Sequence, residues 1–360
     1  MSIHFHPLTI LDIRRETSDC VSIAFDIPDA LKDIFRFREG QNITLRTVLN
    51  GEELRRSYSV CSSPLEGELR VAVKAVSEGR FSRYANSQLK KGDTLEVLPP
   101  TGKFYTRLDP SHRKKYVAIA AGSGITPIFS IIKTVLATEP HSEFTLVFGN
   151  RNRSSIIFRE ALEALKNKYM ERFRLVHVLS RERTDAEINH GRIDAAKCEE
   201  LGAKLIDWMD SDHYFLCGPE AMIFSVRDYL LGLGVDGSKI HFELFTSPGQ
   251  VAGATAGKSA VVADSGPVSH ITIKLDGVSF DFDLPYNSHS ILDGALQQGA
   301  DLPYACKGGV CCTCRAKLVS GEVEMDVNYA LEPEEVAAGY ILTCQSHPRS
   351  GKVVVDFDLR

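Results

Sequence analysis

The spacing of the cysteines near the carboxyl end constrains the fold of this 360-residue chain more than any other feature. The stretch CKGGVCCTC holds four thiols, and a fifth follows at Cys344. Cys306, Cys311 and Cys314 form the pattern C-x4-C-x2-C, which is the spacing of a [2Fe–2S] site rather than the paired C-x2-C of zinc ribbons. Because a [2Fe–2S] cluster takes four thiolates, Cys312 is spare and is expected to point away from the metal.

The loop around these cysteines suits close approach of the backbone to a cluster. Gly308 and Gly309 can adopt positive φ, so that amide groups can point at the sulfides. A zinc ion or a chance group of thiols is the alternative interpretation. The chain has nine cysteines, an odd number, so the cluster indicates metal or redox chemistry in a reducing compartment rather than disulfides.

Composition narrows the class of protein further. The net charge is −5 and the pI is about 6.1, which argues against nucleic-acid binding. No apolar run is long enough to span a membrane, and the start of the chain lacks the layout of a secretory signal. We therefore expect a cytoplasmic protein that binds neither nucleic acid nor membrane.

Residues 1–108 are predicted to form an antiparallel β-barrel. QNITLRTV, RRSYSVCSS, GELRVAVKAV and DTLEVLPP are short, partly alternating segments separated by turn residues. One helix is expected at FSRYANSQLKK, with Ser82 at its start.

Residues 109–246 are predicted to form an α/β domain with a parallel sheet. YVAIAA, FTLVFGN, FRLVHVLS and HYFLCG are nearly continuous apolar runs. Helical patterns at 127–138, 155–169 and 219–233 separate them, as in βαβ crossovers.

The remaining chain divides into a linker and a small α+β domain. Residues 247–268 are rich in Gly, Ala and Ser and predict a flexible linker. Residues 269–360 begin with a hairpin signal at Asp276–Gly277, followed by a helix at SILDGALQQG, the cysteine loop, two short strands and a final KVVVDFD strand.

Two segments before the linker suggest sites for anions. AIAAGSGITPI is a strand, a glycine turn with Gly122 and Gly124, and a helix that Thr126 is expected to cap, so its amides could hold a pyrophosphate. The alternative is a plain βα turn. In RRSYSV, Arg56 and Tyr58 alternate on one strand face and so place a cation beside an aromatic ring, although a simple surface pair is also possible.

Together, Arg-x-Tyr-Ser, EGRFS, the glycine turn and CGP resemble the ferredoxin-NADP reductase superfamily over about residues 3–246. The resemblance implies FAD on the barrel and a nicotinamide dinucleotide on the second domain. It implies flavin contacts from Arg56, Tyr58, Ser59, Gly79 and Ser82, and dinucleotide contacts from Gly122, Gly124, Thr126, Gly218 and Pro219. It also implies that Ser59, Cys217 and Glu243 are catalytic and that Phe245 approaches the flavin. Each has a plainer alternative: a serine bonded to backbone, a buried inert thiol, a solvated carboxylate.

The choice between NADPH and NADH depends on the residues that meet the adenosine ribose. Ser180 and Arg181, after a strand, are similar to the pair that holds the 2′-phosphate in NADPH-using relatives, and Arg151 could assist. We expect NADPH, with NADH as the alternative.

Residues 269–360 resemble plant-type ferredoxins, which implies a β-grasp fold with Cys306, Cys311, Cys314 and Cys344 as cluster ligands. The order of flavin barrel, nucleotide domain and ferredoxin is similar to the reductase components of multicomponent oxygenases. ADLPYACKGGVC and NYALEPEEVAAGYILTCQ resemble the reductases of ring-1,2-phenylacetyl-CoA epoxidases, which implies a di-iron oxygenase complex as partner. One alternative is a reductase for a Rieske-type ring-hydroxylating or steroid oxygenase; another is a non-catalytic redox sensor or binding module.

Overall fold

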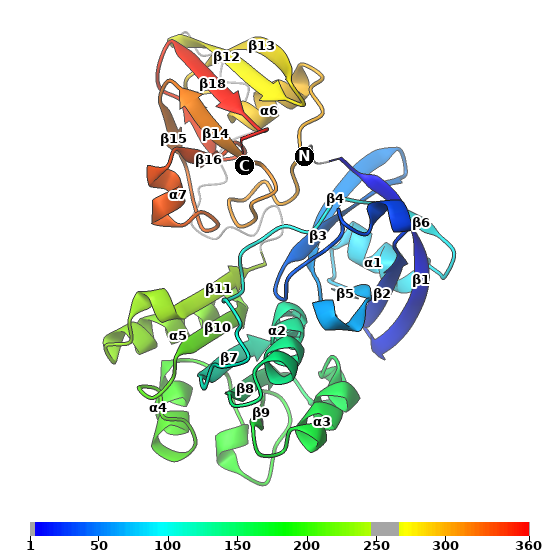
Figure 1. Ribbon diagram of the computed structural model, residues 1–360, viewed down its shortest axis with the longest axis vertical. Helices are drawn as coiled ribbons and strands as arrows, with labels where there is room; N and C mark the ends of the chain where they lie inside the picture. The colour runs from blue at the N-terminus through cyan, green and yellow to red at the C-terminus, as the bar shows by residue number, and fades with distance from the viewer. Residues whose placement is uncertain (1–3, 246–265, 360) are drawn as a thin grey trace. The chain divides into compact units, whose positions relative to one another are not determined.

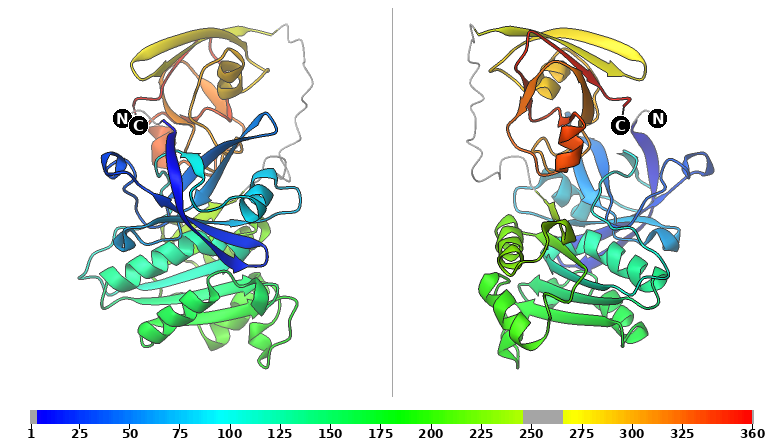
Figure 2. Two further views of the ribbon diagram at one scale, coloured as in Figure 1. Left: turned by 90° about the vertical axis from the view of Figure 1, so that its right-hand side faces the viewer. Right: turned by 60° about the vertical axis from the view of Figure 1, so that its left-hand side comes forward.

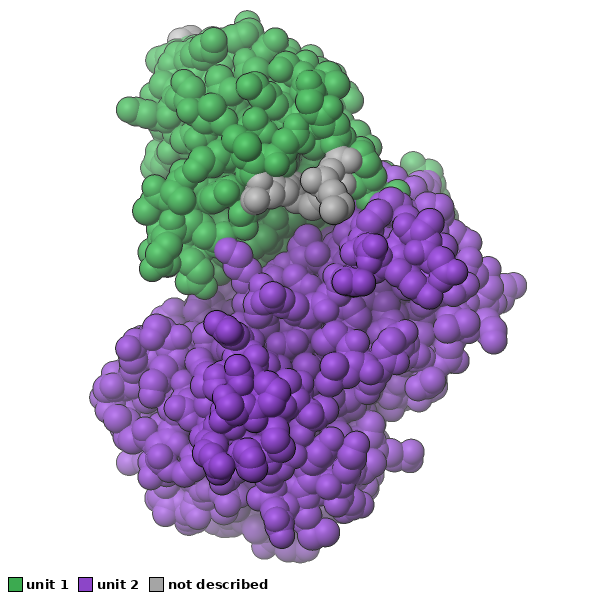
Figure 3. Space-filling view, viewed as in Figure 1, with its two compact units in different colours: residues 1–5, 49–57, 246–360 green, residues 6–48, 58–245 purple. Residues whose placement is uncertain are grey.

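The computed structural model describes residues 4–245 and 266–359. The chain forms two compact units, one of residues 1–5, 49–57 and 246–360 and the other of residues 6–48 and 58–245, coloured separately in Figure 3. Most of the predicted linker, up to residue 265, lies outside the described residues. Within the described ranges, no helix combines the length and the apolar character needed to cross a bilayer.

The first sheet has six strands in the order β4-β3-β6-β1-β2-β5 (Figure 1). An isolated antiparallel bridge between Val60, which follows β4, and Val71 on β5 brings the two ends of this order together, so the sheet closes as the predicted antiparallel barrel. Its elements are β1 (His6–Thr17), β2 (Cys20–Asp26), η1 (Asp29–Leu31), β3 (Asn42–Leu49), β4 (Glu52–Ser59), η2 (Pro64–Glu66), β5 (Leu69–Lys74), α1 (Arg80–Ser87) and β6 (Thr94–Val97).

The second sheet is parallel, as predicted, with the order β11-β10-β7-β8-β9. In Figure 2, α2 runs alongside its strands. The elements are β7 (Lys115–Ala121), η3 (Gly122–Gly124), α2 (Ile125–Thr138), β8 (Glu143–Asn150), η4 (Arg153–Ser155), α3 (Arg159–Lys168), β9 (Phe173–Leu179), η5 (Glu187–Asn189), α4 (Ala195–Lys204), β10 (His213–Gly218), α5 (Glu220–Gly232), η6 (Gly237–Lys239) and β11 (Ile240–Leu244).

The order of this sheet determines where a ligand can bind. From β7 the chain adds β8 and β9 on one side, then returns to place β10 and β11 on the other side. The switch point therefore lies between β7 and β10, and ligands of open α/β sheets bind at the carboxyl ends of the strands there. Helix α4 was not predicted, because only Cys198 and Leu201 on it are buried and its apolar pattern is weak.

The third sheet, in the carboxyl-terminal domain, has the order β13-β12-β18-β14-β16, and β15 and β17 pair separately. Asp276 (φ 55°) and Gly277 (φ 72°) form the predicted hairpin turn. Four short strands, rather than the two predicted, lie between the cysteine loop and β18. The elements are β12 (Val268–Leu275), β13 (Val278–Pro285), α6 (Ile291–Gln297), β14 (Arg315–Ser320), β15 (Val323–Met325), α7 (Pro333–Ala337), β16 (Tyr340–Leu342), β17 (Ser346–Pro348) and β18 (Lys352–Asp356).

Candidate functional site

A partly buried hydrogen bond joins the barrel to the nucleotide domain. Ser59, at the end of β4, donates from Oγ to Glu243 Oε2 on β11 at 2.8 Å. Asn42, at the start of β3, donates from Nδ2 to Glu243 Oε1 at 3.4 Å. Burial raises the pKa of Glu243 to about 7, although the hydrogen bonds from Ser59 and Asn42 act in the opposite direction. This carboxyl group therefore changes charge near neutral pH.

Asn42 is a site residue that sequence reasoning missed. Its side chain is buried, and its Oδ1 has no hydrogen-bond partner in the structure. Such an atom is costly to leave unpaired, so it is suited to accept a hydrogen bond from a bound group. No signal in the sequence marks Asn42, since an asparagine at a strand start is ordinary.

Cys217 lies beside Glu243 because β10 and β11 pair in parallel with these two residues in register. The thiol is fully buried. Burial, and then the negative charge of Glu243, raise the pKa of Cys217 well above its usual value. At neutral pH this sulfur is a compact neutral group that can shape a binding surface but is a poor nucleophile.

The glycine turn meets Cys217 at the switch point of the sheet. A Cβ on Gly124 would lie 2.1 Å from the carbonyl oxygen of Cys217, so only glycine fits there. Gly122 has a φ of 55°, in the region that favours glycine. The turn therefore lies against the start of the segment Cys217–Pro219, and it leads directly into the amino end of α2, whose dipole favours an anion.

The prediction that Thr126 caps this helix is wrong. The turn Gly122–Gly124 is a 3₁₀ helix that continues into α2 from Ile125, so Thr126 is already inside the helix. Its Oγ1 donates to the carbonyl oxygen of Ser123 at 3.0 Å. The start of the helix thus lacks a side-chain cap, and its amides are not satisfied by Thr126.

Among the predicted flavin residues on the barrel, Gly79 and Ser82 lie at the start of α1 and Tyr58 lies on β4. Gly79 is the residue before α1, and a Cβ there would lie 2.2 Å from Ser82 Oγ. The helix begins at Arg80, so Ser82 is in its first turn rather than before it, and its Oγ donates to the carbonyl oxygen of Gly79 at 3.2 Å. The ring of Tyr58 lies 5.6 Å from that of Phe81.

For two other predicted flavin residues, Arg56 and Phe245, the structure gives no contact with Gly79, Ser82 or Tyr58. Arg56 belongs to residues 49–57 of the other compact unit, and its Nη1 donates to the carbonyl oxygen of Arg55 at 2.7 Å. Phe245, the last described residue before the gap, has an exposed side chain. Their expected contacts with a flavin remain predictions.

The residues predicted to meet the adenosine end lie after β8 and β9. The amide of Arg181 donates to the carbonyl oxygen of Arg151 at 2.8 Å, and the amide of Ser180 donates to Asn150. The two arginines are therefore adjacent at the carboxyl edge of the sheet, and both side chains are exposed. Glu182 is the acidic residue closest to them in sequence. Its carboxylate accepts a hydrogen bond from the backbone amide of Arg153 at 2.8 Å.

A cavity of about 280 Å³ opens near these residues. Arg153, Arg159, His177 and Thr184 are among the side chains that line it. The carboxylates of Glu163 and Asp185 also line it, whereas Arg151, Ser180 and Arg181 do not.

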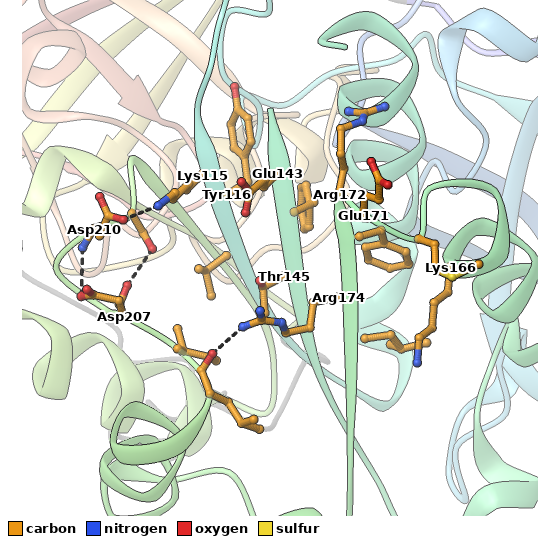
Figure 4. Close-up of a pocket in the computed structure, with 18 residues that line it drawn as sticks. Lys115, Tyr116, Glu143, Thr145, Lys166, Glu171, Arg172, Arg174, Asp207 and Asp210 are labelled. Carbon is orange, nitrogen blue, oxygen red and sulfur yellow. Dashed lines mark hydrogen bonds and ion pairs between the residues drawn. The ribbon is translucent and has the colours of Figure 1, made fainter. Parts of the chain in front are cut away.

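A second cavity, of about 450 Å³, lies at the amino ends of β7, β8 and β9 (Figure 4). Lys115 pairs with Asp210 there, and Arg174 donates to the carbonyl oxygen of Leu205. None of the predicted site residues lines this cavity, and it is at the edge opposite the glycine turn.

The four predicted ligand cysteines converge in the carboxyl-terminal domain. The sulfurs of Cys306 and Cys311 are 3.1 Å apart. Hydrogen bonds, first from the Cys311 thiol and then from Cys344, lower the pKa of Cys306, and a hydrogen bond from Cys344 lowers that of Cys314. These contacts link the four sulfurs to one another in a chain, and four thiolates are the donor set that a [2Fe–2S] cluster takes. Cys312 points elsewhere, since its Sγ bonds to the carbonyl oxygen of Ala330 at 3.2 Å.

The backbone of the cysteine loop differs in one detail from the prediction. Positive φ occurs at Lys307 (52°) and Gly309 (72°), and not at Gly308. The amide of Gly308 nevertheless donates to Cys306 Sγ at 3.3 Å, as a cluster-binding loop requires. A Cβ on Gly309 would lie 2.9 Å from the carbonyl oxygen of Val327, so close packing also requires glycine at this position.

Gln345 is the second site residue that sequence reasoning missed. Its side-chain amide reaches both the cysteine loop and Cys344. Its position directly after a ligand cysteine is the only signal in the sequence that could have identified it.

Comparison with known proteins matches three family models. These are an oxidoreductase FAD-binding domain at residues 7–105, an oxidoreductase NAD-binding domain at 118–228, and a 2Fe-2S iron-sulfur cluster binding domain at 273–349. The models cover most of the barrel, the nucleotide domain up to α5, and the cysteine loop.

Several relatives match along the whole chain. One component of the 1,2-phenylacetyl-CoA epoxidase of Escherichia coli K12 is 48% identical, with 99% of this chain and 98% of that protein covered. The ferredoxin reductase component of 3-ketosteroid-9-alpha-monooxygenase from Rhodococcus rhodochrous is 34% identical, with 97% and 96% covered. Among solved structures, phthalate dioxygenase reductase is 25% identical with a TM-score of 0.57 and covers 98% of both chains.

Proposed function

The chain belongs to the family of FAD- and [2Fe–2S]-containing NAD(P)H-dependent reductases that serves multicomponent oxygenases, and we propose that it delivers electrons to an epoxidase acting on phenylacetyl-CoA. The observation that carries this proposal is the 48% identity to the epoxidase component over 99% of the chain. The barrel would hold FAD, the parallel-sheet domain would hold NADPH, and Cys306, Cys311, Cys314 and Cys344 would hold the [2Fe–2S] cluster, with a di-iron oxygenase complex as the proposed electron acceptor.

The cofactors supply the redox chemistry, because flavin accepts hydride as a pair of electrons and the cluster carries one electron at a time. The chain's residues bind and orient. The backbone amides at Gly122–Gly124 and the amino end of α2 would hold the pyrophosphate at the switch point. Cys217, neutral and buried, would support from beneath the partly exposed Gly218 and the exposed Pro219, against which the nicotinamide would lie.

Glu243 would hold or release a proton beside the flavin. Its pKa of about 7 lets it exist in either form, and Ser59 fixes one of its oxygens. The Oδ1 atom of Asn42, buried and unpaired, would complete the polar lining.

We propose NADPH as the donor. The support is the adjacent pair Arg151 and Arg181 together with Ser180, at the carboxyl edge of the sheet where an adenosine 2′-phosphate would lie. The contacts of Glu182 are consistent with NADPH. Its carboxylate is bound by Arg153 and is therefore not free to bind a ribose hydroxyl, as an acidic residue would in an NADH site. We also propose a cytoplasmic location, on the grounds that none of the nine cysteines is paired in a disulfide; cell fractionation tests this.

Reconstitution with purified oxygenases tests the proposed partner. The chain, NADPH and the oxygenase component of a phenylacetyl-CoA epoxidase are expected to convert phenylacetyl-CoA, with NADPH consumed in step with product. The second candidate, supported by the 34% identity to a 3-ketosteroid-9-alpha-monooxygenase reductase, is tested by exchanging the oxygenase for that enzyme. Turnover with the steroid oxygenase alone would overturn the proposed partner.

A further inference from the structure

The side chain of Gln345 forms a bridge inside the proposed cluster site. Its Nε2 donates to the carbonyl oxygen of Lys307 at 2.9 Å and to that of Cys344 at 3.0 Å, and it lies 3.6 Å from Cys344 Sγ. The side chain is buried. One amide group therefore links the loop that carries Cys306 and Cys311 to the distant segment that carries Cys344.

This bridge stabilises an unfavourable backbone conformation at Lys307 in the cysteine loop. Lys307 has a φ of 52°, which costs energy for a residue with a side chain. The bond from Gln345 to the Lys307 carbonyl supports that conformation directly. Packing contributes as well, since a Cβ on Gly309 would lie only 3.3 Å from Gln345 Cγ.

The cationic side chains near the ligands have other partners. Lys307 Nζ pairs with Asp293 at 2.7 Å, and Arg315 Nη1 pairs with Glu335 at 2.9 Å. Each positive charge therefore lies beside a carboxylate, which offsets its effect on the electron affinity of a nearby group. Hydrogen bonds to the sulfurs are one means by which the protein can favour the reduced, more negative cluster.

We propose that Gln345 is a positioning residue of the cluster site, and that its Nε2, 3.6 Å from Cys344 Sγ, raises the reduction potential of the cluster through an N–H group shared between this sulfur and the Cys344 carbonyl oxygen. This inference rests on the proposed function, since it takes the four cysteines as ligands. Reduction adds negative charge to the cluster and its thiolates, so a donor at Cys344 stabilises the reduced form more than the oxidised form.

The test compares Gln345→Met with Gln298→Met. Methionine keeps most of the volume of glutamine and removes the amide, and Gln298, exposed beyond α6, provides the same chemical change away from the sulfurs. The cluster potential is measured by anaerobic redox titration followed by electron paramagnetic resonance. We expect the equilibrium constant for cluster reduction to fall about tenfold in Gln345→Met, equivalent to about 59 mV for a one-electron couple, with no change in Gln298→Met. An unchanged potential in Gln345→Met protein with full iron content would overturn the inference.

A second measurement needs no variant. Wild-type protein carrying ¹⁵N at the glutamine side chains is reduced and studied by pulsed electron paramagnetic resonance. A ¹⁵N coupling to the cluster supports the inference, and the absence of any coupling overturns it even if Gln345→Met does not assemble. Wild-type protein that shows no [2Fe–2S] signal at all contradicts the proposed function instead, so the two failures are distinguishable.

Discussion

Ser59 on β4 donates a hydrogen bond of 2.8 Å to Glu243 on β11, across 184 positions of the chain. The two residues come from the barrel and the parallel sheet, and neither sheet alone contains the pair. Because Cys217 lies in register with Glu243 and packs against Gly124, the same contact region connects the barrel to the glycine turn. This is where a flavin on the barrel and a nicotinamide on the second domain would meet.

Ser59→Ala is expected to slow the reduction of bound FAD by NADPH about 10- to 100-fold, since small misplacements of groups at a reacting centre cost rates of that order. The reason is that Glu243 loses the hydrogen bond that fixes its Oε2. Stopped-flow absorbance at the flavin band measures the rate. Ser87→Ala, at an exposed serine whose Oγ bonds to the carbonyl oxygen of Arg83, is the matched control. Equal rates in Ser59→Ala and Ser87→Ala, with FAD retained, would contradict the role.

The raised pKa of Glu243 predicts a dependence of stability on pH. The folded pKa of about 7 lies above the ordinary 4.5, so the folded chain holds this proton more tightly than the unfolded chain. The stabilisation is complete below pH 4.5 and is lost as the pH rises to about 7, by up to about 3 kcal/mol. Thermal unfolding of wild type and Glu243→Gln from pH 5 to pH 8 measures it. The wild type should lose stability relative to the variant as pH rises; parallel curves would show that Glu243 does not titrate in this range.

Gly124→Ala should both destabilise the nucleotide domain and weaken NADPH binding. The added Cβ would lie 2.1 Å from the Cys217 carbonyl oxygen, which is backbone and cannot rotate away. Overpacking of this kind costs about 1–3 kcal/mol. The control is Gly232→Ala at the end of α5, where a Cβ meets nothing within 4 Å. Calorimetry and nucleotide titration check both effects, and a Gly124→Ala protein that binds NADPH as tightly as Gly232→Ala would refute the close packing.

Arg181→Ala is expected to lower kcat/KM for NADPH about 10- to 100-fold and to leave that for NADH nearly unchanged, because it would remove the charged hydrogen bond that we propose to the 2′-phosphate. Steady-state kinetics with both nucleotides measure the ratio. Arg183→Ala, two residues along and also exposed, controls for general loss of positive charge. If the wild type prefers NADH and Arg181→Ala does not alter that preference, the proposed donor is wrong.

Much of the architecture could be predicted because local chemistry and global fold agree. The hairpin at Asp276–Gly277 requires two positive φ values, which this pair provides, and the apolar strands of the parallel sheet differ plainly from the alternating strands of the barrel. The cluster site could be predicted from the cysteine spacing because three of the four sulfurs belong to one loop.

The missed features depend on tertiary contacts that no local pattern encodes. Asn42 and Gln345 act through amides that meet partners 201 and 38 positions away. Thr126 would cap a helix that began at Pro127. Because the 3₁₀ turn Gly122–Gly124 runs directly into α2, the helix begins at Ile125 instead. The positive φ at Lys307 likewise could not be predicted, because the adjacent Gly308 and Gly309 appeared sufficient to provide the positive φ values of the loop.

Anaerobic titration of the purified protein with NADPH, followed by visible absorbance and metal analysis, tests the central claim most directly. The account predicts about two irons per chain, bleaching of the flavin band, and bleaching of the cluster absorbance, with cluster reduction dependent on all four of Cys306, Cys311, Cys314 and Cys344. Zinc in place of iron, or a spectrum that NADPH leaves unchanged, would contradict it.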